Sequence, residues 1–454
     1  MLMRMITVVA LSCLALAAGL TAGDENLRTL RRESDAVIVT ALSAPALAGL
    51  RIEKLRVYAG RGGLLAPIPF QIDEKTKDND WVFLSGPEKN PGDGDGIFNG
   101  RDELIVMARD LGNRAAGPAG LPASGPPGYQ KAFEVRGLDP VDRGEGYAYI
   151  LYFDAPPPRS RQDYVRIDPA TSRIVALHYV LGFSRQAPMA MDELAVTAAG
   201  GGDGVDYCDR LKARLHCQIA GVSIDKTEED FTVELVAWTD GPVRVIRRTR
   251  SRLMLVWNIP SPSARLDNIY YYNSFSFPTE VYLPIDLGFI VKDARFRVSV
   301  DSPRLSGQRR YRNSLYPQGV IQDGKMSPLE AKLAADPRPF TWSSTGTVGA
   351  DGKDHGAWFN RLLVAGDNPE WKPRVFYVDD ENQLDPPDLE PGSFGNGGYQ
   401  IAGLAHLPAG VYRLDSIMYS VPVFEPAMAE LYMRILDHPL AVTVKRMQSM
   451  EPKP

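Results

Sequence analysis

The feature that most limits what this chain can fold into is the division of its apolar residues into short runs by glycine and proline. The sequence has 454 residues, of which 41 are glycine and 36 are proline. Residues 147–153, Tyr-Ala-Tyr-Ile-Leu-Tyr-Phe, form the clearest run, and a triple proline at 156–158 ends it. Apolar runs of about four to eight residues between turn-forming residues are typical of β-strands. We therefore predict a mainly β fold, an antiparallel β-sandwich or supersandwich.

Helical signals are few and short. Ser327-Pro-Leu-Glu330 has the spacing of a capping box with proline at the first helical position, and residues 331–335 continue it. Residues 426–436 form a second candidate helix. The sequence therefore predicts a few short helices added to a β structure.

The N-terminus has the pattern of a secretory signal peptide. Arg4 precedes an apolar, small-residue stretch over residues 5–20, and Leu20-Thr-Ala22 is a cleavage sequence. A lipoprotein signal at Cys13 is the second interpretation, because the large residue before that cysteine is wrongly placed for it. No later run is long and apolar enough to span a bilayer. We predict export to the periplasm or the extracellular space.

An acidic, glycine-rich segment, residues 90–104, has the character of a calcium loop and resembles the loops of EF-hand and dockerin proteins. With Asp95 at position 5 of such a loop, Gly96 makes the sharp turn. Pro91 then leaves position 1 without a side-chain oxygen, so a neighbouring oxygen-bearing residue must replace it. Gly-Asp repeats also suit a solvated turn, but we favour a structural Ca²⁺ site. Its ligands would be Asp93, Asp95, the Ile97 carbonyl, Asn99 and Asp102, with the first ligand from Asp73, Asp78, Asp80 or Asn90.

A second acidic segment, residues 379–390, is broken by proline and matches no ligand template. We interpret it as a solvated loop in preference to a second cation site. The five histidines are scattered without metal-ligand spacing, so neither a zinc site nor histidine-based catalysis is indicated.

Two cysteines remain after signal cleavage, Cys208 and Cys217. In an exported chain the simplest prediction for this spacing is one disulfide across a hairpin, worth about 2–3 kcal/mol. The alternative is a pair of buried thiols.

Residues 240–250 begin with an Asp-Gly turn and continue as a strand. With a period of two, Arg244, Arg248 and Arg250 share one face of that strand. Three arginines on one face can hold planar carboxylates or sulfates, but a face of cross-strand ion pairs is the commoner arrangement, and we favour it. The aromatic residues that follow, which could stack on sugar rings or fill a core, are Tyr270, Tyr271 and Tyr272.

Three motifs together resemble exported bacterial proteins of β-supersandwich type, related to polysaccharide-lyase and mutarotase-like families. They are Pro69-Phe-Gln-Ile-Asp73, the Asp-Gly-Asp-Gly loop with Asp102-Glu-Leu104, and Asp240-Gly-Pro-Val-Arg244. The resemblance covers these short motifs only. It implies a large antiparallel sandwich with a carbohydrate-facing cleft.

These features predict four regions. Residues 1–22 are the signal peptide, and 23–160 form an N-terminal β domain with the calcium loop. Residues 161–310 form a central β-sandwich region, and 311–454 a C-terminal β-rich region with short helices.

The leading functional hypothesis is a non-catalytic, exported, calcium-stabilised protein that binds a polysaccharide or a cell-surface protein. The alternative is a carbohydrate-active lyase or hydrolase on an acidic polysaccharide. In the lyase, Arg244 would neutralise the uronate and Tyr271 would abstract a proton, while Arg248, Arg250, Tyr270 and Tyr272 would contact the substrate. A third hypothesis is an accessory subunit of an exported complex. The net charge of −5 argues against nucleic acid as a partner.

Overall fold

The computed structural model divides into two compact units, each described by itself. The first unit comprises Met1–Trp81, Gly94–Gln162 and Ile435–Pro454, and the second comprises Val82–Asp93 and Asp163–Arg434. The residues described are 27–115, 121, 125–184, 190–219, 221–254, 260–261, 263–283, 286, 288, 291–303, 308–364, 371–389 and 393–447. The predicted signal peptide, residues 1–22, lies outside them.

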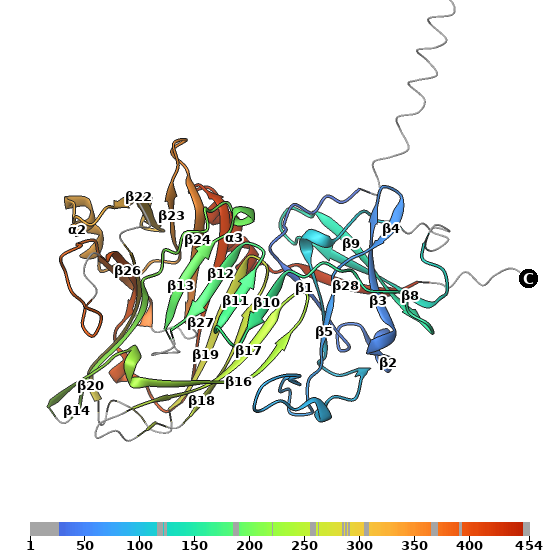
Figure 1. The fold of residues 1–454 in the computed structure, drawn as a ribbon, viewed down its shortest axis with the longest axis horizontal. Helices are drawn as coiled ribbons and strands as arrows, with labels where there is room; N and C mark the ends of the chain where they lie inside the picture. Colours follow the sequence, from blue (N-terminus) through green and yellow to red (C-terminus); the bar gives the residue numbers. More distant parts are fainter. Residues whose placement is uncertain are drawn as a thin grey trace, which may run out of the picture. The chain divides into compact units, whose positions relative to one another are not determined.

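The predicted fold class is confirmed. The described residues form antiparallel sheets with two short α-helices, α2 (Pro328–Ala334) and α3 (Met428–Asp437) (Figure 1). The capping box that begins α2 is as predicted: the Glu330 carboxylate accepts from the Ser327 amide at 2.7 Å, and the Ser327 hydroxyl accepts from the Glu330 amide at 3.3 Å. Single turns of 3₁₀ helix are η1 (Pro45–Leu47), η2 (Ile52–Lys54), η3 (Pro91–Asp93), η4 (Ala108–Asp110), η5 (Ala198–Gly200), η6 (Glu228–Asp230) and η11 (Leu404–His406).

The first unit is a sandwich of small antiparallel sheets. Its sheet orders are β28-β8-β9-β3-β4, β1-β7-β5 and β2-β6. One apolar cluster joins the first two sheets, with Val37 and Val106 on one side and Phe133 and Ile150 on the other. The strands are β1 (Ala36–Thr40), β2 (Leu50–Arg51), β3 (Leu55–Arg61), β4 (Leu64–Pro67), β5 (Gln71–Asp73), β6 (Ile97–Phe98), β7 (Glu103–Met107), β8 (Tyr129–Leu138), β9 (Glu145–Phe153) and β28 (Ala441–Arg446).

The last strand, β28, belongs to the first unit although it lies at the far end of the chain. It pairs with β8, and Lys445 lies opposite Glu134. Arg32, which is 1% exposed, donates to the carbonyl oxygens of His438 at 2.6 Å and Ile435 at 3.3 Å. Its guanidinium also pairs with the buried Asp35 carboxylate. These contacts hold the C-terminal segment in the first unit.

The second unit is built on a nine-stranded antiparallel sheet with order β16-β17-β18-β19-β27-β24-β23-β21-β22. A four-stranded sheet, β10-β11-β12-β13, packs on one part of it through Tyr179, Phe275 and Trp358. A five-stranded sheet, β15-β14-β20-β26-β25, packs on another part through Tyr311 and Tyr377. The strands are β10 (Val165–Asp168), β11 (Arg173–Ala176), β12 (Tyr179–Phe183), β13 (Met191–Val196), β14 (Arg210–Ile219), β15 (Val222–Lys226), β16 (Phe231–Asp240), β17 (Val245–Leu253), β18 (Ala264–Tyr270), β19 (Ser274–Leu283), β20 (Val291–Ser302), β21 (Arg309–Asn313), β22 (Tyr316–Gln322), β23 (Ser343–Val348), β24 (Asp354–Val364), β25 (Arg374–Val378), β26 (Phe394–Ile401) and β27 (Gly410–Phe424).

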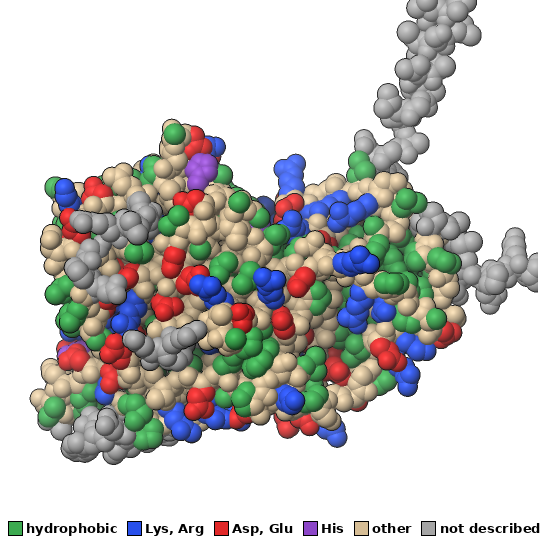
Figure 2. All heavy atoms as spheres, viewed as in Figure 1, with side chains coloured by type: hydrophobic (Ala, Val, Ile, Leu, Met, Phe, Trp, Pro, Cys, Tyr) green, Lys and Arg blue, Asp and Glu red, His purple; other side chains and the backbone are tan. Residues whose placement is uncertain are grey.

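Charges of both signs are interspersed on the face of the molecule drawn in Figure 2. Among the helices of the described residues, none is long and apolar enough to cross a membrane.

Candidate functional site

The predicted arginine face on β17 is engaged by carboxylates that include those of the neighbouring strands β16 and β18. Arg248 donates through Nε and Nη2 to the two oxygens of Asp267, each at 2.6 Å. Arg250 donates to Glu234 on β16 at 3.3 Å and also pairs with Glu88. These two arginines form cross-strand ion pairs, the arrangement favoured from the sequence.

The structure brings together Arg244 and Tyr271, the two candidate catalytic residues. An Nη1 atom of Arg244 donates to the Tyr271 hydroxyl at 3.4 Å, and Arg244 is 1% exposed. The flanking tyrosines point elsewhere: Tyr270 is fully buried in the apolar core, and Tyr272 packs against Tyr164 and His178. Neither flanking ring is therefore placed to stack on a sugar at the surface.

The acidic turn near residue 95 is ordered by hydrogen bonds between carboxylates and the backbone. Asp95 accepts from the Ile97 amide and from the Asn99 side chain, each at 2.8 Å. Asp102, 2% exposed, accepts from the amides of Lys75 and Asn99, also at 2.8 Å.

Further hydrogen bonds complete this turn. Glu74, which is not among the predicted calcium ligands, accepts from the amides of Asp95 at 3.0 Å and Gly96 at 2.8 Å. The Ile97 carbonyl accepts from the Asn99 side chain at 3.0 Å. Asp93, in the second unit, accepts instead from the Asn90 side chain at 2.9 Å. Gly96 has φ +70°, as its position in a sharp turn requires.

The predicted disulfide is wrong, because Cys208 and Cys217 are free, buried thiols. Cys217 lies on β14, and Cys208 lies just before the start of the same strand. Consecutive residues of a strand rise about 3.3 Å each, which separates the two by roughly 20 Å or more. A disulfide needs Cα atoms within about 7 Å, so the two thiols cannot meet.

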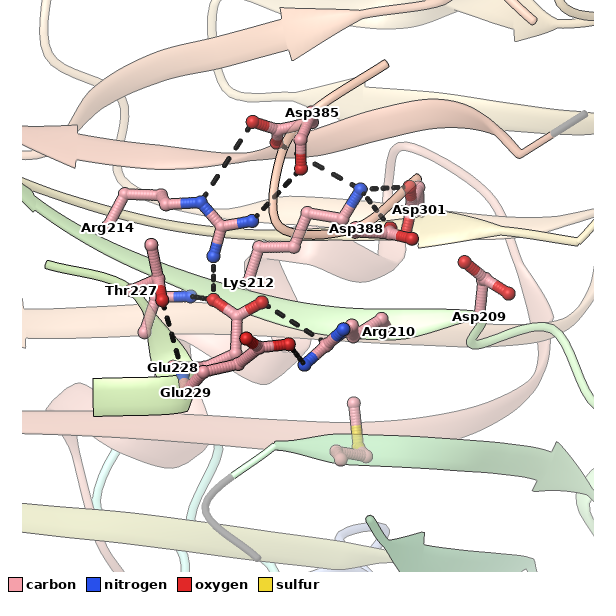
Figure 3. Close-up of polar contacts among 12 residues, drawn as sticks. Asp209, Arg210, Lys212, Arg214, Thr227, Glu228, Glu229, Asp301, Asp385 and Asp388 are labelled. Carbon is pink, nitrogen blue, oxygen red and sulfur yellow. Dashed lines mark hydrogen bonds and ion pairs between the residues drawn. The ribbon is translucent and has the colours of Figure 1, made fainter. Parts of the chain in front are cut away.

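The acidic segment 379–389 is paired with Lys212 and Arg214 of β14 (Figure 3) and with Arg297 of β20. Lys212 lies 2% exposed, with its ammonium 2.5 Å from Asp301 and 2.6 Å from Asp388. Asp385 accepts from Arg297 at 2.7 and 3.0 Å. Part of the acidic segment is therefore an ion-paired loop and not a fully solvated one.

Asp209, Asp301 and Asp388 form a group of acidic side chains whose oxygen atoms all lie within 4.8 Å of one another. Among the described residues, no other three acidic, histidine or cysteine side chains meet that spacing. Burial raises the pKa of Asp301 to about 6, although Lys212 opposes this shift. The ammonium of Lys212 already supplies a cation to two of these carboxylates.

A cavity of about 230 Å³ lies over β8, β9 and β28 of the first unit. We call it the sheet groove. In the sheet, Lys445 lies opposite Glu134, and Arg136 lies between Thr443 on one neighbouring strand and Tyr147 on the other. Side chains of residues that lie opposite one another project from the same face of a sheet. The side chains that line it are Arg114, Glu134, Arg136, Glu145, Tyr147, Thr443 and Lys445.

Ion pairs hold the two carboxylates of the sheet groove in place. Arg114 donates in bidentate fashion to Glu134 at 3.0 and 3.1 Å, and its guanidinium lies 5.5 Å from the centre of the Tyr147 ring. Glu145 accepts from Arg136 and from the Tyr147 hydroxyl. The hydrogen bond from Arg136 lowers the pKa of Glu145, while burial raises that of Tyr147 to about 12.

Lys445 is the cation of the sheet groove without a carboxylate of its own. It is exposed, and no ion pair or hydrogen bond joins it to any residue that the structure describes. The groove thus has three cationic side chains against two carboxylates, which leaves one positive charge for a ligand. The sequence did not predict the sheet groove, because the third strand of the groove, β28, comes from the far end of the chain.

Comparison with known proteins finds distant structural similarity. No family model matches the chain, and no curated protein matches it. An α-mannosidase from Enterococcus faecalis V583 is 10% identical with a TM-score of 0.44, over 94% of this chain and 46% of that one. A protein in glycosyl hydrolase family 38 from Enterococcus faecalis is 10% identical with a TM-score of 0.40, over 94% of this chain and 48% of that one. The chain spans about half the length of these two chains, and a resemblance of this degree says nothing of a substrate.

Proposed function

We propose that this protein is an exported, non-catalytic binding protein that holds an acidic polysaccharide in the sheet groove of its first unit. The observation that carries the proposal is the composition of that groove: three cations, two carboxylates and a tyrosine on one sheet face. The exposed ammonium of Lys445 can pair with a uronate carboxylate. The carboxylates of Glu134 and Glu145 can accept hydrogen bonds from sugar hydroxyls.

The ionisation of the groove argues for binding over hydrolysis. A glycosidase needs one carboxyl group that stays protonated near neutral pH to act as the general acid. Arg136 holds the pKa of Glu145 below its usual range, so this carboxylate is ionised at neutral pH. Glu134 is held by both donors of Arg114. Glu145 is thus placed to orient a ligand instead of protonating one.

The lyase alternative rests on the contact between Arg244 and Tyr271. It requires the guanidinium to reach a substrate carboxylate, whereas Arg244 is 1% exposed. Incubation with a panel of acidic polysaccharides, followed by unsaturated-uronate absorbance, separates the two functions. Product formation that disappears in Arg244→Ala and Tyr271→Phe variants would replace the binding proposal by the lyase.

Replacing Lys445 with alanine should weaken binding of an acidic oligosaccharide about fivefold. Loss of one exposed ion pair is worth up to about 1 kcal/mol, and roughly 1.4 kcal/mol corresponds to a tenfold change. Calorimetric titration with oligogalacturonate at low salt measures it, and higher salt should weaken wild-type binding. Lys77→Ala, which removes another exposed lysine of the same unit, is the matched control and should bind as wild type. Equal affinities for Lys445→Ala and wild type would remove the groove from the proposal.

We also propose that the acidic turn binds Ca²⁺ as a structural ion. Carboxylates that accept backbone hydrogen bonds keep lone pairs for a metal, so Asp95 and Asp102 can still serve as ligands. Calcium at about 100 times its Kd should stabilise the protein by about 2.7 kcal/mol, seen as a higher Tm than in EDTA. Asp95→Ala should abolish that difference, and Asp380→Ala, on an exposed acidic loop, should not. Identical melting curves in calcium and in EDTA would exclude the ion.

A further inference from the structure

A second cavity, of about 100 Å³, lies inside the second unit, where the nine-stranded and five-stranded sheets face each other. We call it the inner cavity. Its walls include side chains from β21, β24 and β27 and the glycine-rich strand β26. The residues that matter below are Tyr207, Arg309, Trp358, Gly397 and Met418. The binding function proposed above uses none of them.

Four polar side chains on the walls of the inner cavity, Tyr207, Tyr311, Ser344 and Trp358, each have a buried donor atom without a hydrogen-bond partner among the described residues. The indole Nε1 of Trp358 and the hydroxyl of Tyr207 are buried atoms with no hydrogen-bond partner among the residues that the structure describes. Trp358 is 3% exposed, and its indole can only donate. Burial holds the pKa of Tyr207 well above its usual value, so its hydroxyl also remains a donor. Buried polar groups in folded proteins nearly always have a partner, so several unpartnered donors on one cavity point to an occupant.

The inner cavity also carries positive charge. Arg309, 3% exposed, donates to the Tyr207 carbonyl at 3.1 Å and to the Ser302 hydroxyl at 2.8 Å. Its guanidinium lies 4.0 Å from the centre of the Tyr207 ring. Burial lowers the pKa of Arg309 to about 10, so it stays charged at neutral pH. None of the described lining residues is acidic, although Asp203 and Asp206 act on Arg309 electrostatically.

The glycines of β26 leave room on the opposite wall. A Cβ added to Gly397 would lie 3.5 Å from the Tyr377 ring and 3.8 Å from the Tyr311 ring, which is ordinary contact. A Cβ on Gly398 would instead meet the Val298 carbonyl oxygen at 2.0 Å. Strand packing therefore requires glycine at 398 but not at 397, where the missing side chain adds to the cavity.

We propose that the inner cavity binds a small organic carboxylate, with its oxygens facing Trp358 Nε1 and the Tyr207 hydroxyl in the field of Arg309. The donors, the charge and the absence of acidic lining residues all favour an anionic acceptor over a cation or a donor-rich ligand. The thioether of Met418 offers an apolar surface for the carbon part of the acid. A cavity needs about 10–15 Å³ to hold one water molecule. The inner cavity, at about 100 Å³, therefore accommodates an acid of several non-hydrogen atoms.

The test uses the full-length protein, the variants Trp358→Phe and Tyr207→Phe, and a panel of acetate, lactate, succinate and glucuronate with glycerol and glucose as neutral controls. Thermal unfolding and calorimetric titration give stability and affinity. Tyr179→Phe is the matched control, because that buried hydroxyl already donates to the Ser274 carbonyl at 3.1 Å. Tyr207→Phe removes only the orphan hydroxyl and should leave the Tm of the free protein unchanged or higher, whereas Tyr179→Phe should lower it.

At least one acid should raise the Tm of the wild type, and the neutral compounds should not. Each of Trp358→Phe and Tyr207→Phe should weaken that acid about tenfold, Gly397→Ala should abolish binding, and Tyr179→Phe should keep the affinity. No binding of any acid at 10 mM, or equal binding by both donor variants and the wild type, would overturn the proposal and leave a water-filled cavity. Lys445→Ala should not change this binding, so the result is independent of the sheet groove.

Discussion

Replacing Lys212 with methionine is expected to destabilise the second unit by about 3–5 kcal/mol. The ammonium of Lys212 lies between Asp301 and Asp388, and the lysine and both aspartates are less than 10% exposed. Methionine has a similar length but leaves the two carboxylates buried without their cation, which is the costly way to break a buried ion pair. Equilibrium unfolding in urea, followed by tryptophan fluorescence, measures the loss.

The decrease in the free energy of unfolding caused by Lys212→Met should be smaller at pH 5 than at pH 7.5. Burial raises the folded-state pKa of Asp301 to about 6, above its usual value of 3.8. A group whose pKa is raised on folding stabilises the folded state fully below its unfolded pKa. This stabilisation is lost as the pH rises through its folded pKa. Protonation at pH 5 therefore removes part of the uncompensated charge. Lys353→Met breaks a half-exposed pair with Glu425 and should cost less than about 1 kcal/mol. Similar losses in the two variants would contradict the role given to Lys212.

Arg32→Met should destabilise the first unit by a similar 3–5 kcal/mol. Arg32 is 1% exposed, pairs with Asp35, and donates to the carbonyl oxygens of Ile435 and His438. The substitution leaves a buried carboxylate and two carbonyl oxygens without this donor. It also removes a link to the segment that leads into β28, so exchange protection of that strand should fall.

Urea unfolding and native-state hydrogen exchange on β28 check this result. Arg51→Met is the control, because Arg51 pairs with Glu53 at the surface and both side chains are more than 60% exposed. That variant should be within about 1 kcal/mol of wild type. Unchanged protection of residues 441–446 in Arg32→Met would show that Arg32 does not secure the C-terminal segment.

Local patterns were sufficient to predict the β class and the helix caps. Residues 147–153 fall within β9, and the Ser327–Glu330 box begins α2, because strand runs and caps depend on neighbours in the sequence. The alternation of Arg248 and Arg250 also predicted a face of cross-strand ion pairs, and Asp267 and Glu234 supply the partners.

Features that depend on distant pairing could not be predicted. The spacing of Cys208 and Cys217 is the same along one strand as across a hairpin, so the sequence could not show that the thiols are far apart. Arg210, Lys212 and Arg214 alternate along β14, but only the fold places Asp301 and the acidic loop against Lys212. The sheet groove needs the pairing of β28 with β8, and no local pattern gives that register.

Binding of an acidic saccharide in the sheet groove of the first unit should slow backbone exchange on the strands that form it. Hydrogen–deuterium exchange of the wild-type protein with and without saturating oligogalacturonate tests it most directly. We expect slower exchange confined to β8, β9 and β28 and, at an oligogalacturonate concentration near the wild-type Kd, a clearly smaller change in Lys445→Ala. Protection around Arg244 and Tyr271 with none on β28 would contradict it and move the ligand to the second unit.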